Sequence, residues 1–205
     1  MINIEELSGC LEQDVSILLD RYHKEKTKEH VFQVAKKSVD LARQFQVDER
    51  ICFEAALLHD ISAIVSPLEM QEIANDHGLL LDPAEKKYPF LLHQRISVIF
   101  ARELFNIDNE DILSAIGCHT TLKAHPSVYD MIVFLADKIA WDQQGEPPYL
   151  AMLEKDLEIS LQKACFDFIE MQWKEGHLLY PHQWIKEAYA DLQEYMNHCS
   201  EKVFS

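Results

Sequence analysis

The stretch Leu57-Leu58-His59-Asp60 places a histidine and an aspartate side by side at the end of an apolar run. The residues before it, from Ile51 onward, are apolar nearly all round, which is typical of a central helix. A His-Asp pair has little specificity in a chain with 10 histidines. The pair therefore carries weight only together with other polar residues that stand in apolar helical segments.

Four further polar residues stand in such segments: His30, His93, His119 and Asp137. Asp137 is the most informative, because it follows the apolar run Ile132-Val133-Phe134-Leu135. A carboxylate buried there is costly unless a cation pairs with it. The histidines lie near the ends of predicted helices, so residues from four or five helices could converge on one pocket.

The composition favours one all-α domain spanning residues 1–205. The chain is 48% hydrophobic, which suits one sizeable core, and it has only 5 glycines and 7 prolines. Few segments alternate apolar and polar residues as strands do. Apolar spacing and capping residues predict helices over about 4–22, 27–45, 48–59, 66–77, 90–105, 108–119, 127 to beyond 137, 149–174 and 182–197.

Charge and hydropathy exclude several classes of partner. The formal net charge of −16 argues against nucleic acid or an anionic membrane as the main partner. It leaves room for a small anionic substrate, because bound metal ions can dominate the local charge. No apolar stretch reaches about 18 residues, and the first residues do not resemble a signal peptide. With 5 scattered cysteines and no C-x-x-C motif, we expect reduced thiols in a cytoplasmic protein.

Four imidazoles and two carboxylates are sufficient to bind divalent first-row metals. Two metal ions about 3.5–4 Å apart can generate hydroxide and hold the oxygens of a phosphoryl group. Helical bundles build such sites from side chains on facing helices.

The order His30, His59-Asp60, His93, His119, Asp137 resembles the HD-domain metal-dependent phosphohydrolases. It looks most like the YqeK-type branch, the symmetrical diadenosine tetraphosphate hydrolases of bacteria. The resemblance covers about residues 27–142 and implies an all-α HD-fold bundle, with further C-terminal helices over about 149–198.

The resemblance also implies a ligand set for two metal ions. The first ion would be held by His30, His59, Asp60 and Asp137. The second would be held by His93 and His119, with Asp60 bridging the two ions. Asp60, His93 and His119 would then be the catalytic residues. Iron is the metal usually associated with this branch, and manganese, cobalt or nickel are possible alternatives.

The sequence departs from this branch at positions expected to contact phosphate. Ala63 stands where the branch usually has a lysine, and Leu122 replaces a glycine of its His-Thr-x-Gly motif. After Asp137 the chain reads Lys138-Ile139-Ala140 instead of Ile-Glu-Pro followed by an arginine. Our candidates for binding the substrate phosphate are Arg95, Thr120 and Lys123. We rank Lys138 behind them, as a solvated surface charge.

The resemblance predicts that a metal-bound hydroxide cleaves diadenosine tetraphosphate into two ADP. A second hypothesis is a phosphohydrolase of another nucleotide, such as a nucleoside mono- or diphosphate or an alarmone. A third is a non-catalytic module that senses nucleotide or metal, for which nucleotide affinity without turnover would be diagnostic. A helical bundle with incidental histidines would leave Asp137 and His59-Asp60 as unexplained buried polar groups. The aromatic C-terminal helices could complete the core or form a homodimer interface.

Overall fold

The computed structural model describes residues 7–141 and 144–203, with side chains up to residue 198. All regular secondary structure in the described part is helical, as the sequence predicts, and this part contains no strand. Its α-helices are α1 Leu11–Arg21, α2 Glu25–Phe45, α3 Glu49–Leu58, α4 Pro67–Asp76, α5 Pro83–Lys87, α6 His93–Phe105, α7 Glu110–Cys118, α8 Val128–Ile139, α9 Leu150–Leu157, α10 Leu161–Lys174 and α11 Gln183–Val203. Two 3-10 helices, η1 Ile61–Ile64 and η2 Pro89–Leu92, precede α4 and α6.

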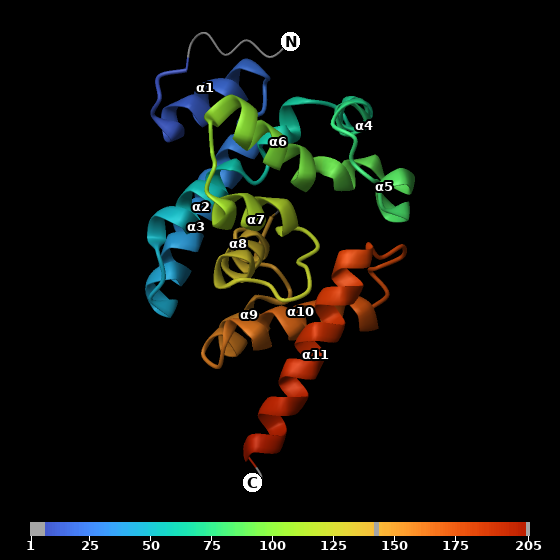
Figure 1. Ribbon diagram of the computed structural model, residues 1–205. Coiled ribbons are helices and arrows are strands. Elements are labelled where there is room, and N and C mark those ends of the chain that lie inside the picture. Colours follow the sequence, from blue (N-terminus) through green and yellow to red (C-terminus); the bar gives the residue numbers. More distant parts are fainter. Residues whose placement is uncertain (1–6, 142–143, 204–205) are drawn as a thin grey trace.

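Helices α3 and α8 lie between two apolar cores. The first core joins α2, α3 and α8 to the C-terminal helices α9, α10 and α11. The second joins α1, α3, α6 and α7, with Val133 of α8 also taking part. Helix α8 packs against α2, α3, α7 and α10, and Figure 1 shows it near the middle of the molecule. This position explains why α3 and α8 are apolar nearly all round, and why a polar residue on either needs a special role.

Capping residues set several helix starts where the sequence predicted them. The Asp48 side chain accepts from the amide of Arg50 at the start of α3. Ser66, Asp82 and Ser127 each form a capping box at the starts of α4, α5 and α8. These caps orient the segments on either side of the central His-Asp pair.

Two predicted helix starts are wrong. Helix α2 begins at Glu25 with Lys24 at the cap position, so Thr27 lies inside the first turn. The turn between α1 and α2 is short, because His23 adopts a left-handed conformation with φ 55°. Helix α7 is capped by Asn109 instead of Asp108, since the Asn109 side chain accepts from the amides of residues 111 and 112.

Two predicted helix extents also need correction. The region 149–174 forms two helices, because Ser160 is extended at φ −170° and its side chain caps α10 by accepting from the amide of Lys163. The first helix starts at Leu11, and residues 7–10 are not helical. Residues 4–6 of that predicted helix, and residue 142 of the predicted HD core, lie outside the described residues.

Within the described residues, no single helix is long and apolar enough to cross a membrane. The segments Glu49–Ile64 and Pro67–Asp76, taken together across a 106° bend, are the one pair in the described part of the chain that meets the length and composition required.

We predict that Asp48→Ala lowers the free energy of unfolding by about 1 kcal/mol, because it removes a helix cap. Asp48→Ser, which keeps a capping oxygen, should recover most of this loss. Urea denaturation followed by circular dichroism measures both variants. Equal stability of Asp48→Ala and the wild type would show that the Asp48 cap contributes nothing.

Candidate metal centre

Five helical elements bring the six predicted ligands into one cluster. Four of the six side chains come from helix ends, and two come from within helices. His59 and His119 follow the last residues of α3 and α7, Asp60 follows His59, His93 begins α6, His30 lies in α2 and Asp137 lies in α8. Two triads within the cluster, His30-His59-Asp137 and His59-Asp60-His119, each have their nitrogen and oxygen atoms within 4.8 Å of one another.

The helix ends explain how three of the histidines are oriented. Carbonyl groups in the last turn of a helix have no partner within the helix. The His59 Nδ1 lies 2.7 Å from the Ala56 carbonyl oxygen, and the His119 Nδ1 lies 2.8 Å from that of Ile116. His93 repeats the pattern, with its Nδ1 2.7 Å from a carbonyl oxygen in η2. Because each Nδ1–H donates to a carbonyl, Nε2 is the ring nitrogen that remains for a metal ion, as in metal-ligating histidines.

The carboxylate of Asp60 faces two different sets of histidines. Its Oδ2 lies 3.6 Å from His59 Nε2. Its Oδ1 lies 3.5 Å from His119 Nε2 and 3.7 Å from His93 Nε2. On the far side of His59, Asp137 Oδ1 lies 3.6 Å from His59 Nε2 and 3.0 Å from His30 Nε2. The cluster is therefore a continuous row of nitrogen and oxygen donors with Asp60 in the middle.

The two carboxylates are held in their ionised form. Burial would raise the pKa of Asp60, but the neighbouring histidines outweigh burial and lower its pKa. Burial likewise opposes ionisation of Asp137, but Lys138 and the histidines hold its pKa well below the usual value. Burial lowers the pKa of His59, yet the carboxylates of Asp60 and Asp137 outweigh burial and raise it to about 9. Burial, together with His59 and His93, lowers the pKa of His119 to about 4 although Asp60 opposes this.

The donor atoms fit divalent metal ions. His59 Nε2 is buried and has no hydrogen-bond partner among the described residues. The Nε2 atoms of His93 and His119 lie 3.0 Å apart, although neither carries a proton in the tautomer set by the carbonyl groups. Lone pairs directed at each other in this way need a positive charge nearby. Imidazole and carboxylate ligands suit iron, manganese, cobalt, nickel or zinc.

Buried polar residues that the sequence analysis missed hold the ligand-bearing segments together. The Ser62 hydroxyl donates to the His93 carbonyl oxygen at 2.9 Å and also contacts Ser97, joining η1 to α6. The Gln94 side chain accepts from the Thr120 amide at 3.2 Å and contacts the Thr121 hydroxyl at 3.2 Å, joining α6 to the loop after His119. The available signal was weak, namely small polar residues on the inner faces of otherwise apolar segments.

The predicted phosphate-binding residues occupy different places. Thr120 lies at the cluster, with its hydroxyl 2.9 Å from His93 Nε2. Arg95 instead pairs with buried Glu85 at 2.9 Å and donates to the carbonyl oxygen of Leu80.

Lys123 pairs with buried Asp130 at 3.3 Å and donates to the hydroxyl of Ser114. Arg95 and Lys123 line a groove of about 380 Å³ between α6 and α7, on the face of these helices that carries no ligand. Lys138, ranked last from the sequence, reaches the cluster and contacts Asp137.

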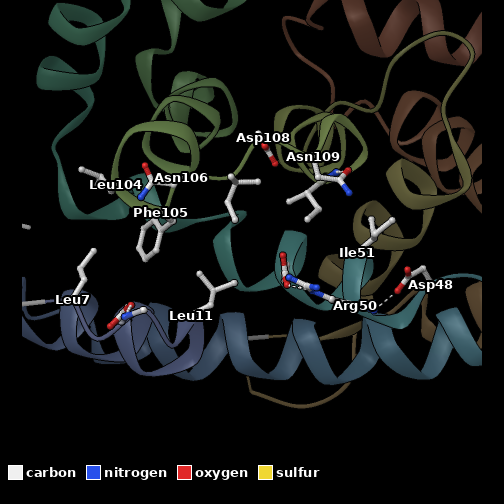
Figure 2. A pocket seen from close by; sticks show the side chains of 15 residues that line it. Leu7, Leu11, Asp48, Arg50, Ile51, Leu104, Phe105, Asn106, Asp108 and Asn109 are labelled. Atoms are coloured by element: carbon white, nitrogen blue, oxygen red, sulfur yellow. Dashed lines mark hydrogen bonds and ion pairs between the residues drawn. The ribbon is translucent and has the colours of Figure 1, made fainter.

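A large cavity of the described structure lies away from the cluster. It has a volume of about 780 Å³ and is lined by residues of α1, α3 and the α6–α7 connection. Figure 2 shows Leu11 on one side and Phe105 on the other, with Arg50 between acidic side chains. None of the six clustered residues lines it. The chemistry of the donor groups, and not cavity size, identifies the candidate site.

Comparison with known proteins agrees with this geometry. The model of the HD domain family matches residues 27–142, which is more than half of the chain. The chain belongs to the HD-domain family. The expectation drawn from the order of histidines and aspartates is thereby confirmed, and the protein is an HD-domain phosphohydrolase.

Three individual proteins show how far the likeness extends. The chain is 40% identical over 145 residues to an uncharacterized protein in the pepC 5′ region of Lactococcus lactis subsp. cremoris, covering 71% of this chain and 74% of that protein. It is 27% identical over 159 residues to a symmetrical bis(5′-nucleosyl)-tetraphosphatase of Halalkalibacterium halodurans, covering 75% and 82%. A crystal structure from Clostridium acetobutylicum, described as a predicted HD superfamily hydrolase involved in NAD metabolism, matches with a TM-score of 0.81 and 26% identity, covering 89% and 97%.

We predict that Asp60→Ala reduces the metal bound per chain by at least half, because the middle donor of the row is lost. Asp76→Ala, an exposed aspartate at the end of α4, is the matched control and should bind metal as the wild type does. Plasma mass spectrometry of protein loaded with manganese measures both. Full metal content in Asp60→Ala would overturn the assignment of Asp60 as a ligand.

Proposed function

We propose that this HD-family hydrolase cleaves diadenosine tetraphosphate symmetrically into two ADP, using two divalent metal ions, with iron the favoured metal. The observation that carries the proposal is the position of Asp60, whose Oδ2 faces His59 and whose Oδ1 faces His93 and His119. A carboxylate placed in this way can bridge two metal ions.

The same distances support the ligand assignment that the family resemblance implies. One ion would be held by His30, His59 and Asp137 with Asp60 Oδ2, and the other by His93 and His119 with Asp60 Oδ1. When bound, such ions lower the pKa of a coordinated water and neutralise charge on phosphoryl oxygens.

The exposure of the six residues indicates the side from which substrate approaches. His59 and His119 are buried and form the floor of the site. The side chains of Asp60 and His93 are 28% and 21% exposed and form its open side. Thr120 lies beside His93 on this side, and with a metal ion on His93 Nε2 its hydroxyl would be free to donate to a phosphate oxygen. We propose Asp60, His93 and His119 as the catalytic residues and Thr120 as a phosphate contact.

One comparison supports a nucleoside polyphosphate as the substrate, and the charge of the chain restricts where such a substrate can bind. The relative from Halalkalibacterium halodurans is named as a symmetrical tetraphosphatase. A chain of net charge −16 repels a polyanion over most of its surface, so attraction must come from the metal site and the few cations near it. Attack on the second phosphorus from one adenosine releases ADP from both halves of the substrate.

Another nucleotide remains the second candidate, because the cations expected around phosphate are absent or engaged elsewhere. Ala63 occupies the position at which the branch usually has a lysine, and it lies in η1, three residues after Asp60. Arg95 and Lys123 are each paired with a buried carboxylate. A site with fewer cations favours a shorter phosphate chain, such as that of a nucleoside mono- or diphosphate.

We further propose that the HD core and the C-terminal helices act as one unit in the cytoplasm. Helix α10 packs against α8, which carries Asp137, so the two regions share a core. The four cysteines whose side chains are described are free thiols, which suits a reducing compartment.

We predict that protein purified without oxygen and loaded with ferrous iron or manganese converts diadenosine tetraphosphate to ADP as the sole nucleotide product. Ion-exchange chromatography of the reaction resolves ADP from AMP and ATP. AMP and ATP in equal amounts would contradict symmetrical cleavage. No cleavage by protein with verified metal content would contradict the substrate, and a panel of nucleoside mono- and diphosphates would then test the second candidate.

A further inference from the structure

Lys138 places a positive charge directly beside the metal-ligand cluster. Its Nζ lies 2.5 Å from Asp137 Oδ2 and 3.1 Å from the carbonyl oxygen of His119. The side chain is 16% exposed, and its ammonium lies 5.0 Å from the ring centre of buried Phe134. Lys138 is therefore part of the site, held between residues of α7 and α8.

The two oxygens of Asp137 divide their partners between Lys138 and the histidines. Oδ1 faces the Nε2 atoms of His30 and His59, at 3.0 and 3.6 Å. Oδ2 faces Lys138. The lysine thus does not occupy the side of the carboxylate that faces the other donors, and Asp137 can bind a metal ion through Oδ1 while Lys138 stays in place.

The ammonium group has one donor left for a ligand. A lysine ammonium has three N–H donors. Asp137 and the His119 carbonyl accept from two, and no third oxygen partner of Lys138 occurs among the described residues. The Lys138 side chain is 16% exposed at the edge of the cluster, so we infer that the remaining donor can meet a ligand there.

Arg95 and Lys123, the two basic residues ranked first from the sequence, are held away from the cluster. The Arg95 guanidinium is bound by buried Glu85 and the Leu80 carbonyl, and the Lys123 ammonium is bound by buried Asp130 and Ser114. Both line the groove between α6 and α7, on the face that carries none of the six clustered residues, so to bind a phosphate group at the cluster each would have to leave its buried carboxylate partner uncompensated.

We propose that Lys138 binds a non-bridging oxygen of the phosphate group at the metal site. The inference rests on the proposed function, in which a phosphate ester occupies this site. Lys138 supplies the cation that Ala63 does not, from a different element of the fold. Its bond to Asp137 fixes where the ammonium lies, so that little side-chain freedom is lost when phosphate binds.

The test compares Lys138→Met, which keeps the length of the side chain without its charge, with Lys138→Arg, which keeps the charge. Lys36→Met, an exposed lysine on α2, is the matched control. For each manganese-loaded protein, metal content is measured by plasma mass spectrometry and the Kd for inorganic phosphate by isothermal titration calorimetry. The kcat and KM for diadenosine tetraphosphate are measured on the same samples.

We expect Lys138→Met to retain its metal and to bind phosphate roughly tenfold to a hundredfold more weakly, as loss of a charge-assisted hydrogen bond implies. Lys138→Arg should recover part of the affinity, and Lys36→Met should match the wild type. Unchanged phosphate affinity in metal-replete Lys138→Met would overturn the proposal. Loss of metal from Lys138→Met, with normal phosphate affinity in the fraction that keeps it, would assign Lys138 a purely structural role and also overturn it.

The phosphate measurement separates this inference from the proposed function. Wild-type protein that binds phosphate through Lys138 but does not cleave diadenosine tetraphosphate would disprove the proposed substrate. The assignment of Lys138 would still be supported by that result.

Discussion

The carboxylate of Asp60, shared between imidazoles of three helical elements, is the interaction on which the rest of the site depends. Two ionised aspartates and four histidines form a row of donors inside an otherwise apolar structure. Such a row is unfavourable unless a positive charge lies within it. The pKa of His59 is raised for the same reason, because the carboxylates of Asp60 and Asp137 favour a positive charge at His59 Nε2. Divalent metal ions meet this requirement with the ligands that the chain supplies.

The fold explains how a small helical protein positions this row. The ends of α3 and α7 provide free carbonyl groups, and a histidine at each end uses one of them to fix its ring. Helices α3 and α8 lie between the two cores, so their ends and inner faces are held by packing on both sides. Ser62 and Gln94 then join the segments that carry Asp60, His93 and His119. The positions of the donor side chains are therefore set by helix ends and by buried polar contacts, both of which are local features.

Much of this could be predicted from the sequence. The apolar runs and capping residues predicted the all-helical fold, and the polar residues within those runs predicted which side chains would meet. The helix start at Asp108 was wrong because the neighbouring Asn109 provides the cap, and the start at Thr27 was wrong because α2 begins at Glu25 without a side-chain cap. The ranking of Arg95 and Lys123 above Lys138 was also unreliable. Sequence spacing showed neither the buried carboxylates that engage the first two nor the contact that brings Lys138 to Asp137.

The acidity of the chain makes the few positive charges at the site decisive for attracting an anionic substrate. With net charge −16, the protein attracts an anionic substrate only where positive charge is concentrated. The metal ions and Lys138 would concentrate it at one place. Arg95 and Lys123 serve the structure instead, since each neutralises a carboxylate that the fold buries.

The most direct test of this account is anomalous diffraction from crystals of the protein loaded with manganese. The account predicts two peaks in the cluster, one beside His30, His59 and Asp137 and the other beside His93 and His119, with the oxygens of Asp60 reaching both. Manganese bound elsewhere, or an Asp60 carboxylate that contacts neither ion, would contradict it.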